Sequence, residues 1–149
     1  MIRGIFILTQ SKYGFILSEL LEGVDIRDYV WAIDHKEVYS PDTDHRFDQE
    51  TLCGESFAEA INTPPEYLLH MGEFKAFQKE SDMVKVETYS DFISSNCQII
   101  ILVADSRFID IYAKDISVLE IIKENANKYG CEKTEYISAD NDERRFMHV

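Results

Sequence analysis

Apolar and polar positions along the chain follow the two periods that distinguish strands from helices. Runs typical of strands occupy Arg3–Leu8, Asp28–Asp34, Tyr67–Gln78 and Glu135–Ser138, with a further strand expected at Arg144–Val149. Apolar residues recur at helical spacing in Lys12–Glu22, Gly54–Ile61 and Asp115–Tyr129. Thr88 or Ser90 is suited to cap a further short helix, and the run around Gly72 also fits a helix or a bent strand. Because a helical stretch separates the first two strand-like runs, the start of the chain predicts a β-α-β unit.

A hairpin is the clearest pattern in the second half of the chain. Its arms are Cys97–Ala104 and Arg107–Ala113. The first arm is continuously apolar, which predicts a central strand with both faces covered. In the second arm Phe108, Asp110 and Tyr112 share one face, so we expect this strand nearer an edge of the sheet. The helix that follows is expected to lie on the hairpin.

The loops and prolines between these elements complete the prediction of the fold class. The polar stretch Asp34–Thr51 predicts a loop with a short strand around Val38. Pro64 and Pro65 separate two halves of the chain, but no linker marks a domain boundary there. These elements predict a single α+β domain over residues 1–149. We expect a mixed, mostly antiparallel sheet, with two longer helices and short helical turns packed on it.

Composition indicates a folded protein with a strongly acidic surface. The chain has 149 residues, of which 45% are hydrophobic and 12% aromatic, enough to form a packed core. It carries 28 Asp and Glu against 15 Lys and Arg, a formal net charge of −13. This charge repels phosphate backbones and anionic membrane surfaces, which argues against nucleic acid and membranes as partners. It attracts a basic protein or a metal ion.

Targeting signals and cysteine usage favour the cytoplasm. The apolar run Ile5–Leu8 is shorter than the roughly 7 to 15 residues of a signal peptide. The run Ile99–Ala104 is too short for a membrane span, which needs about 18 apolar residues. Cys53, Cys97 and Cys131 are odd in number and widely spaced, so reduced thiols are expected rather than a disulfide framework.

Several segments resemble a known family. They are the opening RGIFI, the pairs Tyr13-Gly14 and Tyr29-Val30 with Trp31, and the ending YISADNDERRFMHV. With them the chain resembles a family of short proteins from Bacillus-type bacteria that is catalogued as a domain of unknown function. The resemblance implies a bacterial cytoplasmic protein. It transfers no catalytic or binding residue to this chain.

Two acidic segments hold the candidate binding residues. The candidates for binding a partner are Asp34, Asp42, Asp44, Asp140, Asp142 and Glu143. The candidates for a divalent metal ion are His35, His45, Asp42 and Asp44, because imidazoles and carboxylates are ligands for such ions. The polar loop offers no regular face to hold these ligands, so a solvated acidic loop is the simpler interpretation. Asp140, Asp142 and Glu143 likewise fit a charged turn, since Arg144 and Arg145 stand where a calcium loop needs a ligand and a glycine.

Asp110 is a separate candidate. A carboxylate between two aromatic residues on one strand face could be desolvated, as a general acid requires. The alternatives are a charge that discourages aggregation of strands and a carboxylate paired with Lys or Arg. The pattern favours these alternatives, because one carboxylate is not a mechanism.

Two functional hypotheses follow. The first is a non-enzymatic protein-binding module that docks a basic protein, as small immunity or antitoxin-type proteins do, without a cofactor. The alternative is a small metal-dependent hydrolase that uses the polar loop from Asp34 to His45. Self-association through an exposed strand edge stays open, but no pattern indicates a homo-oligomer. Because the chain has no recognisable catalytic set, the sequence favours the non-enzymatic hypothesis.

Overall fold

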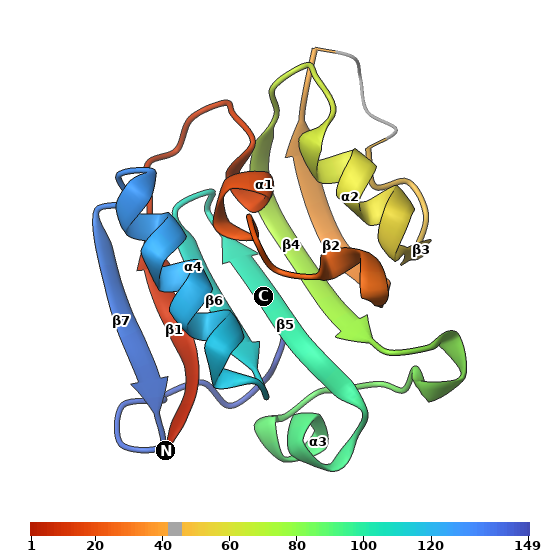
Figure 1. Ribbon diagram of the computed structural model, residues 1–149, viewed down its shortest axis with the longest axis vertical. Helices are drawn as coiled ribbons and strands as arrows, with labels where there is room; N and C mark the ends of the chain where they lie inside the picture. Colours follow the sequence, from red (N-terminus) through yellow and green to blue (C-terminus); the bar gives the residue numbers. More distant parts are fainter. Residues whose placement is uncertain (42–45) are drawn as a thin grey trace.

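One antiparallel sheet organises the molecule (Figure 1). A computed structural model describes residues 1–41 and 46–149, and within them seven strands follow the order β3-β2-β4-β5-β6-β1-β7. The strands are β1 (Ile2–Leu8), β2 (Val30–Tyr39), β3 (Thr51–Cys53), β4 (Leu68–Phe77), β5 (Cys97–Ala104), β6 (Phe108–Ala113) and β7 (Lys133–Ser138). The helices are α1 (Ile16–Leu20), α2 (Gly54–Asn62), α3 (Tyr89–Ser94) and α4 (Ile116–Lys128), with 3-10 turns η1 (Ile26–Asp28) and η2 (Glu80–Asp82). The predicted α+β class is confirmed.

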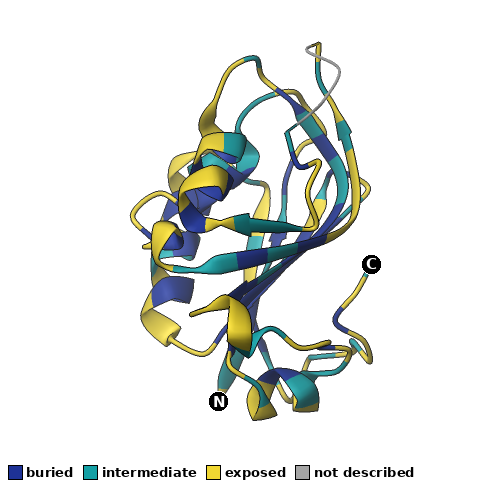
Figure 2. Cartoon of the chain, turned by 90° about the vertical axis from the view of Figure 1, so that its right-hand side faces the viewer, coloured by how far each residue is buried: buried dark blue, intermediate teal, exposed yellow. Residues whose placement is uncertain are grey.

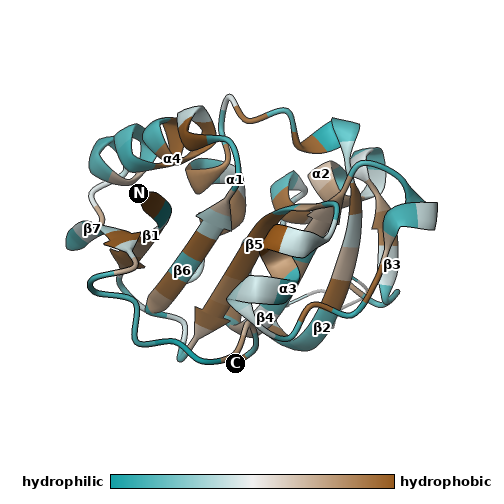
Figure 3. Cartoon of the chain, turned by 90° about the horizontal axis from the view of Figure 1, so that it is seen from below, coloured by the Kyte–Doolittle hydropathy of each residue, from teal (hydrophilic) through white to brown (hydrophobic). Residues whose placement is uncertain are grey.

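Three helices cover one face of the sheet, which we call the first face (Figure 3). Leu17 of α1, Phe57 of α2 and Leu119 of α4 are fully buried there. Trp31 of β2 stacks on Phe57, with 4.1 Å between the ring centroids. The larger apolar core of the protein therefore lies between the sheet and α1, α2 and α4.

The opposite face, the second face, is covered by α3, by the loop before it and by the C-terminal segment, residues 139–149. Phe92 of α3 and Met147 of the C-terminal segment are buried against this face. The backbone N–H of Met147 donates to the carbonyl of Glu87 at 2.7 Å, which ties the segment to the loop. Buried residues consequently run along the strands between two covered faces (Figure 2).

The hairpin and the helix caps agree with the sequence predictions. β5 and β6 pair antiparallel, with Ile99 opposite Ala113 at one end and Ala104 opposite Phe108 at the other. β5 is the central strand of the seven. Thr88 caps α3 in a capping box with Asp91. The run that also fitted a helix is the strand β4. Local signals were sufficient for these elements because each depends on neighbouring residues.

The predicted β-α-β opening is wrong. β1 and β2 are separated in the sheet by β4, β5 and β6. The helix between them is also shorter than predicted, because Gly14 forms two backbone hydrogen bonds with Tyr67, at 3.0 and 3.1 Å. These bonds hold Gly14 in an extended bridge, so α1 starts only at Ile16.

The tertiary structure also bears on four further expectations. β6 lies nearer an edge than the central β5, as expected, but it is not an edge strand, because β1 and then β7 follow it in the sheet. α4 covers the hairpin strand β6, as expected, and it also packs on β1 and β7. The short strand expected around Val38 is the end of β2, which continues to Tyr39 opposite β4, so the predicted loop does not begin at Asp34. Residues 144–149 form no strand, because they cross the second face instead of pairing with an edge.

Candidate functional site

A pocket of about 660 Å³ lies on the second face, between the sheet and the C-terminal segment. Its sheet side is formed by β6, β1 and β7, and its other side by residues 141–149. Two of the predicted binding residues, Asp142 and Glu143, line it. The pocket therefore joins residues that are more than one hundred positions apart in the sequence.

A row of three side chains crosses the floor of this pocket. Phe6 of β1 is the register partner of Asp110 on β6 and of Glu135 on β7. Register partners in neighbouring strands point to the same face of a sheet. All three residues line the pocket, so an aromatic ring lies between two carboxylates. We call this row the Glu135–Phe6–Asp110 row.

Asp110 pairs with Arg144 of the C-terminal segment. Nη2–H and Nε–H of Arg144 donate to Oδ2 of Asp110 at 2.8 and 3.1 Å. Burial raises the pKa of the Asp110 carboxyl, and the hydrogen bond and charge of Arg144 oppose that rise. The expected shared face with Phe108 and Tyr112 is confirmed, and the carboxylate has a cationic partner.

Asp142 anchors the C-terminal segment to the sheet. Its side chain is 3% exposed and accepts hydrogen bonds from Arg3 at 3.2 Å and from the Tyr112 hydroxyl at 3.0 Å. Burial raises the pKa of Tyr112, and the nearby carboxylates raise it further. Because Asp142 is enclosed by these contacts, it positions the pocket wall and does not face a partner directly.

The other predicted binding residues are spread over the molecule. Asp140 and Glu143 are exposed in the segment after β7. Asp34 is on β2, which β4, β5, β6 and β1 separate from β7. Asp42 and Asp44 lie outside the described residues. The described candidates therefore divide between two places, and only the one near β7 is a pocket of this size.

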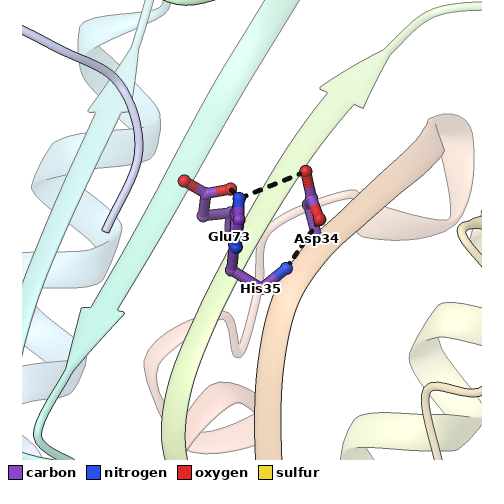
Figure 4. A group of neighbouring side chains, drawn as sticks. All are labelled: Asp34, His35 and Glu73. Atoms are coloured by element: carbon purple, nitrogen blue, oxygen red, sulfur yellow. Dashed lines mark hydrogen bonds and ion pairs between the residues drawn. The ribbon is translucent and has the colours of Figure 1, made fainter.

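The predicted metal ligands are placed in part. Asp42, Asp44 and His45 lie outside the described residues. His35 lies beside Asp34 and also beside Glu73 of β4 (Figure 4). One ligand atom from each of these three side chains lies within 4.8 Å of the others.

Sequence reasoning missed Glu73, Phe6 and Glu135. Each is one residue in an otherwise ordinary strand, and its role depends on which strand lies next to it. Arg144 lies in a segment that was predicted to be a strand, and its side chain reaches Asp110. No local signal could identify these residues, because strand order is a long-range property.

Comparison with known proteins places the chain in a family. A family model described as "Protein of unknown function (DUF2691)" matches residues 2–148. The chain belongs to this family. It is also 29% identical over 152 residues to the "Uncharacterized protein YncE" of Bacillus subtilis (strain 168), and the match covers 99% of each chain. No solved structure matches. The expected resemblance to short Bacillus-type proteins is thereby confirmed.

The described helices were also compared with the length and hydropathy that a membrane span requires. None of them is both long and apolar enough to cross a bilayer.

Proposed function

We propose that this protein is a non-enzymatic binding protein that docks a basic protein and receives a Lys or Arg side chain of that partner in the pocket on the second face. The observation that carries the proposal is the Glu135–Phe6–Asp110 row on the pocket floor. A cation over the ring of Phe6 would gain a cation–π interaction. It would at the same time meet a carboxylate on each side of the ring.

The contact between Arg144 and Asp110 is an example of a guanidinium at this floor, and it already compensates part of the Asp110 charge. It brings a guanidinium to the floor of the pocket, and both of its donated hydrogen bonds go to Oδ2 of Asp110. Oδ1 of Asp110 accepts no hydrogen bond from the described residues and is available to an incoming donor. Glu135 is 53% exposed at its side chain, and its Oε2 lies 3.5 Å from Nζ of Lys133 in an exposed ion pair that an incoming cation would share or displace.

The distribution of charge supports a basic partner. Even if each of the 15 Lys and Arg were paired, 13 of the 28 carboxylates would have no such partner. Among the described residues the side chains of Glu73 and Asp142 are each 3% exposed, but most Asp and Glu are exposed or half-buried, so most of the excess charge lies on or near the surface. Such a surface speeds the approach of a basic protein and makes the association sensitive to salt.

The rim of the pocket offers an apolar contact. Phe146 is 50% exposed and stacks on His148, with 5.2 Å between the ring centroids. An exposed aromatic beside charged groups is typical of the anchor positions of protein interfaces. The metal-dependent hydrolase stays the alternative prediction, because Asp42, Asp44 and His45 of its polar loop lie outside the described residues.

The test is a titration of the isotope-labelled protein with a short peptide that carries one arginine among glycines. The control peptide carries citrulline, which has nearly the shape of arginine but no charge. We expect the arginine peptide alone to shift the amide resonances of β6, β1, β7 and the C-terminal segment. Added salt should weaken the shifts, because it screens the exposed carboxylates.

Matched variants locate the binding. Glu135→Gln should weaken binding of the arginine peptide by about tenfold, which corresponds to roughly 1.4 kcal/mol of binding free energy. Glu120→Gln removes the same charge from an exposed position of α4, on the first face, and should leave the affinity unchanged. Equal affinities for wild type and Glu135→Gln, or equal shifts with citrulline, would refute the proposal. In an affinity capture from the host at low salt, the wild-type protein should retain a basic protein that the Glu135→Gln variant does not retain.

A further inference from the structure

Two carboxylates face each other across the neighbouring strands β2 and β4, toward the β3 edge of the sheet. Asp34 of β2 is the register partner of Glu73 of β4. Like charges directly opposite one another on antiparallel strands are destabilising. A nearby positive charge would therefore stabilise this pair of carboxylates. The inference drawn from it is independent of the function proposed above.

The burial of Glu73 makes such a charge more important. Its side chain is 3% exposed. The Asp142 side chain is equally buried but pairs with Arg3, whereas no Lys or Arg of the described residues lies within ion-pair distance of Glu73. Oε1 accepts a hydrogen bond from the backbone N–H of Val149 at 2.8 Å. Oε2 accepts none from the described residues, and Nε2 of the His35 imidazole lies 3.7 Å from it. A buried carboxylate in this situation is costly unless a cation compensates it.

A bulge in β2 brings His35 to the carboxylates. Successive residues of a regular strand point to opposite faces, so Asp34 and His35 would normally diverge. The pairing of β2 with β4 shifts register between Asp34 and Glu37, and His35 has a φ of 47°. Bulges of this kind redirect a side chain. As a result Nε2 of His35 lies 3.6 Å from Oδ2 of Asp34, and the three side chains converge (Figure 4).

The separations suit a metal ion better than a hydrogen bond. N–H···O bonds are about 2.7–3.2 Å long, shorter than the 3.6 and 3.7 Å found here. Ligand atoms about 2.0–2.2 Å from a tetrahedral ion are roughly 3.4 Å apart. We propose that Oδ2 of Asp34, Nε2 of His35 and Oε2 of Glu73 bind a divalent transition-metal ion of the Zn²⁺ class, with water as the remaining ligand.

Both carboxylates are held ready for this role. The backbone N–H of His35 donates to Oδ1 of Asp34 at 2.8 Å, and that of Val149 donates to Oε1 of Glu73. In each carboxylate one oxygen is thus fixed by the backbone while the other faces the cluster. Outer hydrogen bonds of this kind orient metal ligands. An adjoining cavity of about 320 Å³, lined by Asp34, Glu50 and Glu73 among others, gives water and ions access.

The donor set selects among divalent ions. Ca²⁺ prefers six or more oxygen ligands and Mg²⁺ an octahedron of oxygens, whereas this site offers one imidazole and two carboxylates. Three protein ligands with one imidazole suit Zn²⁺ and leave one position for water. Mn²⁺ should bind more weakly than Zn²⁺ at the same ligands.

The experiment is calorimetric titration of the metal-stripped protein with Zn²⁺. We expect one ion per chain, with Ca²⁺ and Mg²⁺ at least about a hundredfold weaker. His35→Ala and Asp34→Asn should each lower the affinity for Zn²⁺ by at least about tenfold. Because these two side chains are 59% and 76% exposed, the variants retain the fold, and the test does not require changing the buried Glu73.

Two controls exclude other ligands. His70→Gln removes another imidazole, that of β4, and Cys53→Ser removes the exposed thiol; both should bind Zn²⁺ as the wild type does. Zn²⁺ should raise the thermal midpoint of the wild type but not of His35→Ala. The proposal is overturned if the wild type binds no Zn²⁺, if Ca²⁺ binds as tightly, or if His35→Ala and His70→Gln have the same effect.

Discussion

Replacing Arg144 by Gln tests how the C-terminal segment is held against the sheet. The side chain donates two hydrogen bonds to Asp110, at 2.8 and 3.1 Å, and others to the carbonyls of Phe146 and His148, at 3.3 and 2.9 Å. A hydrogen bond to a charged group contributes about 1.5–3 kcal/mol when it is buried. The two paired side chains are 26% and 19% exposed, so solvent reduces this contribution. We expect Arg144→Gln to lower the free energy of unfolding by about 2 kcal/mol.

The size of this loss should depend on pH. Burial raises the pKa of Asp110, and Arg144 opposes the rise. A carboxyl with a higher pKa in the folded than in the unfolded state binds more protons when folded. Stability therefore falls as the pH rises from the ordinary aspartate value through the raised value. Without Arg144 the folded-state pKa rises further, so the loss is largest at neutral pH and shrinks once Asp110 is protonated.

The assay is urea unfolding followed by the fluorescence of Trp31, the single tryptophan, which is fully buried. The matched background is Asp110→Asn, which removes the charge that Arg144 compensates. In that background Arg144→Gln should cost about 1 kcal/mol less than in the wild type. Equal unfolding midpoints for wild type and Arg144→Gln, additive effects of the two substitutions, or a loss independent of pH would refute this reasoning.

Two further substitutions probe the sheet and its second face. A Cβ atom at Gly4 would lie 2.4 Å from the carbonyl oxygen of Ile111, so Gly4→Ala should separate β1 from β6 and cost about 1–3 kcal/mol in urea unfolding. Gly14→Ala, whose Cβ would meet only a flexible side-chain atom at 3.8 Å, should cost clearly less, and equal losses would contradict the argument. Met147 is fully buried against the second face, and Met147→Ala should cost about 2–5 kcal/mol by the same assay. An unchanged midpoint would mean that the segment does not pack there.

Local periodicity predicted the elements that depend on neighbouring residues. The continuous apolar run of β5, the alternation in β6 and the capping residue of α3 are each contained in a few consecutive positions. The length of α1 was misjudged because Gly14 pairs with Tyr67, a residue far along the chain. An isolated sequence pattern cannot reveal such a competing partner.

The candidate sites divide in the same way. Asp34 and His35 are adjacent in the sequence, and both were recognised as polar candidates. Glu73 completes their cluster only because β4 pairs with β2 in a register that places it opposite Asp34. The Asp110 carboxylate was recognised by its aromatic neighbours, but its partner Arg144 arrives from a segment that was expected to be a strand.

The fold class, most strands and helices, the central place of β5 and the excess of negative charge follow from the amino-acid sequence alone, because each depends on local composition and spacing. The tertiary structure alone decided the strand order, the bulge at His35, and the path of residues 139–149 across the second face. These features arise when distant segments compete to cover apolar surface and to satisfy buried polar groups. Both candidate sites consist of side chains that only this competition brings together.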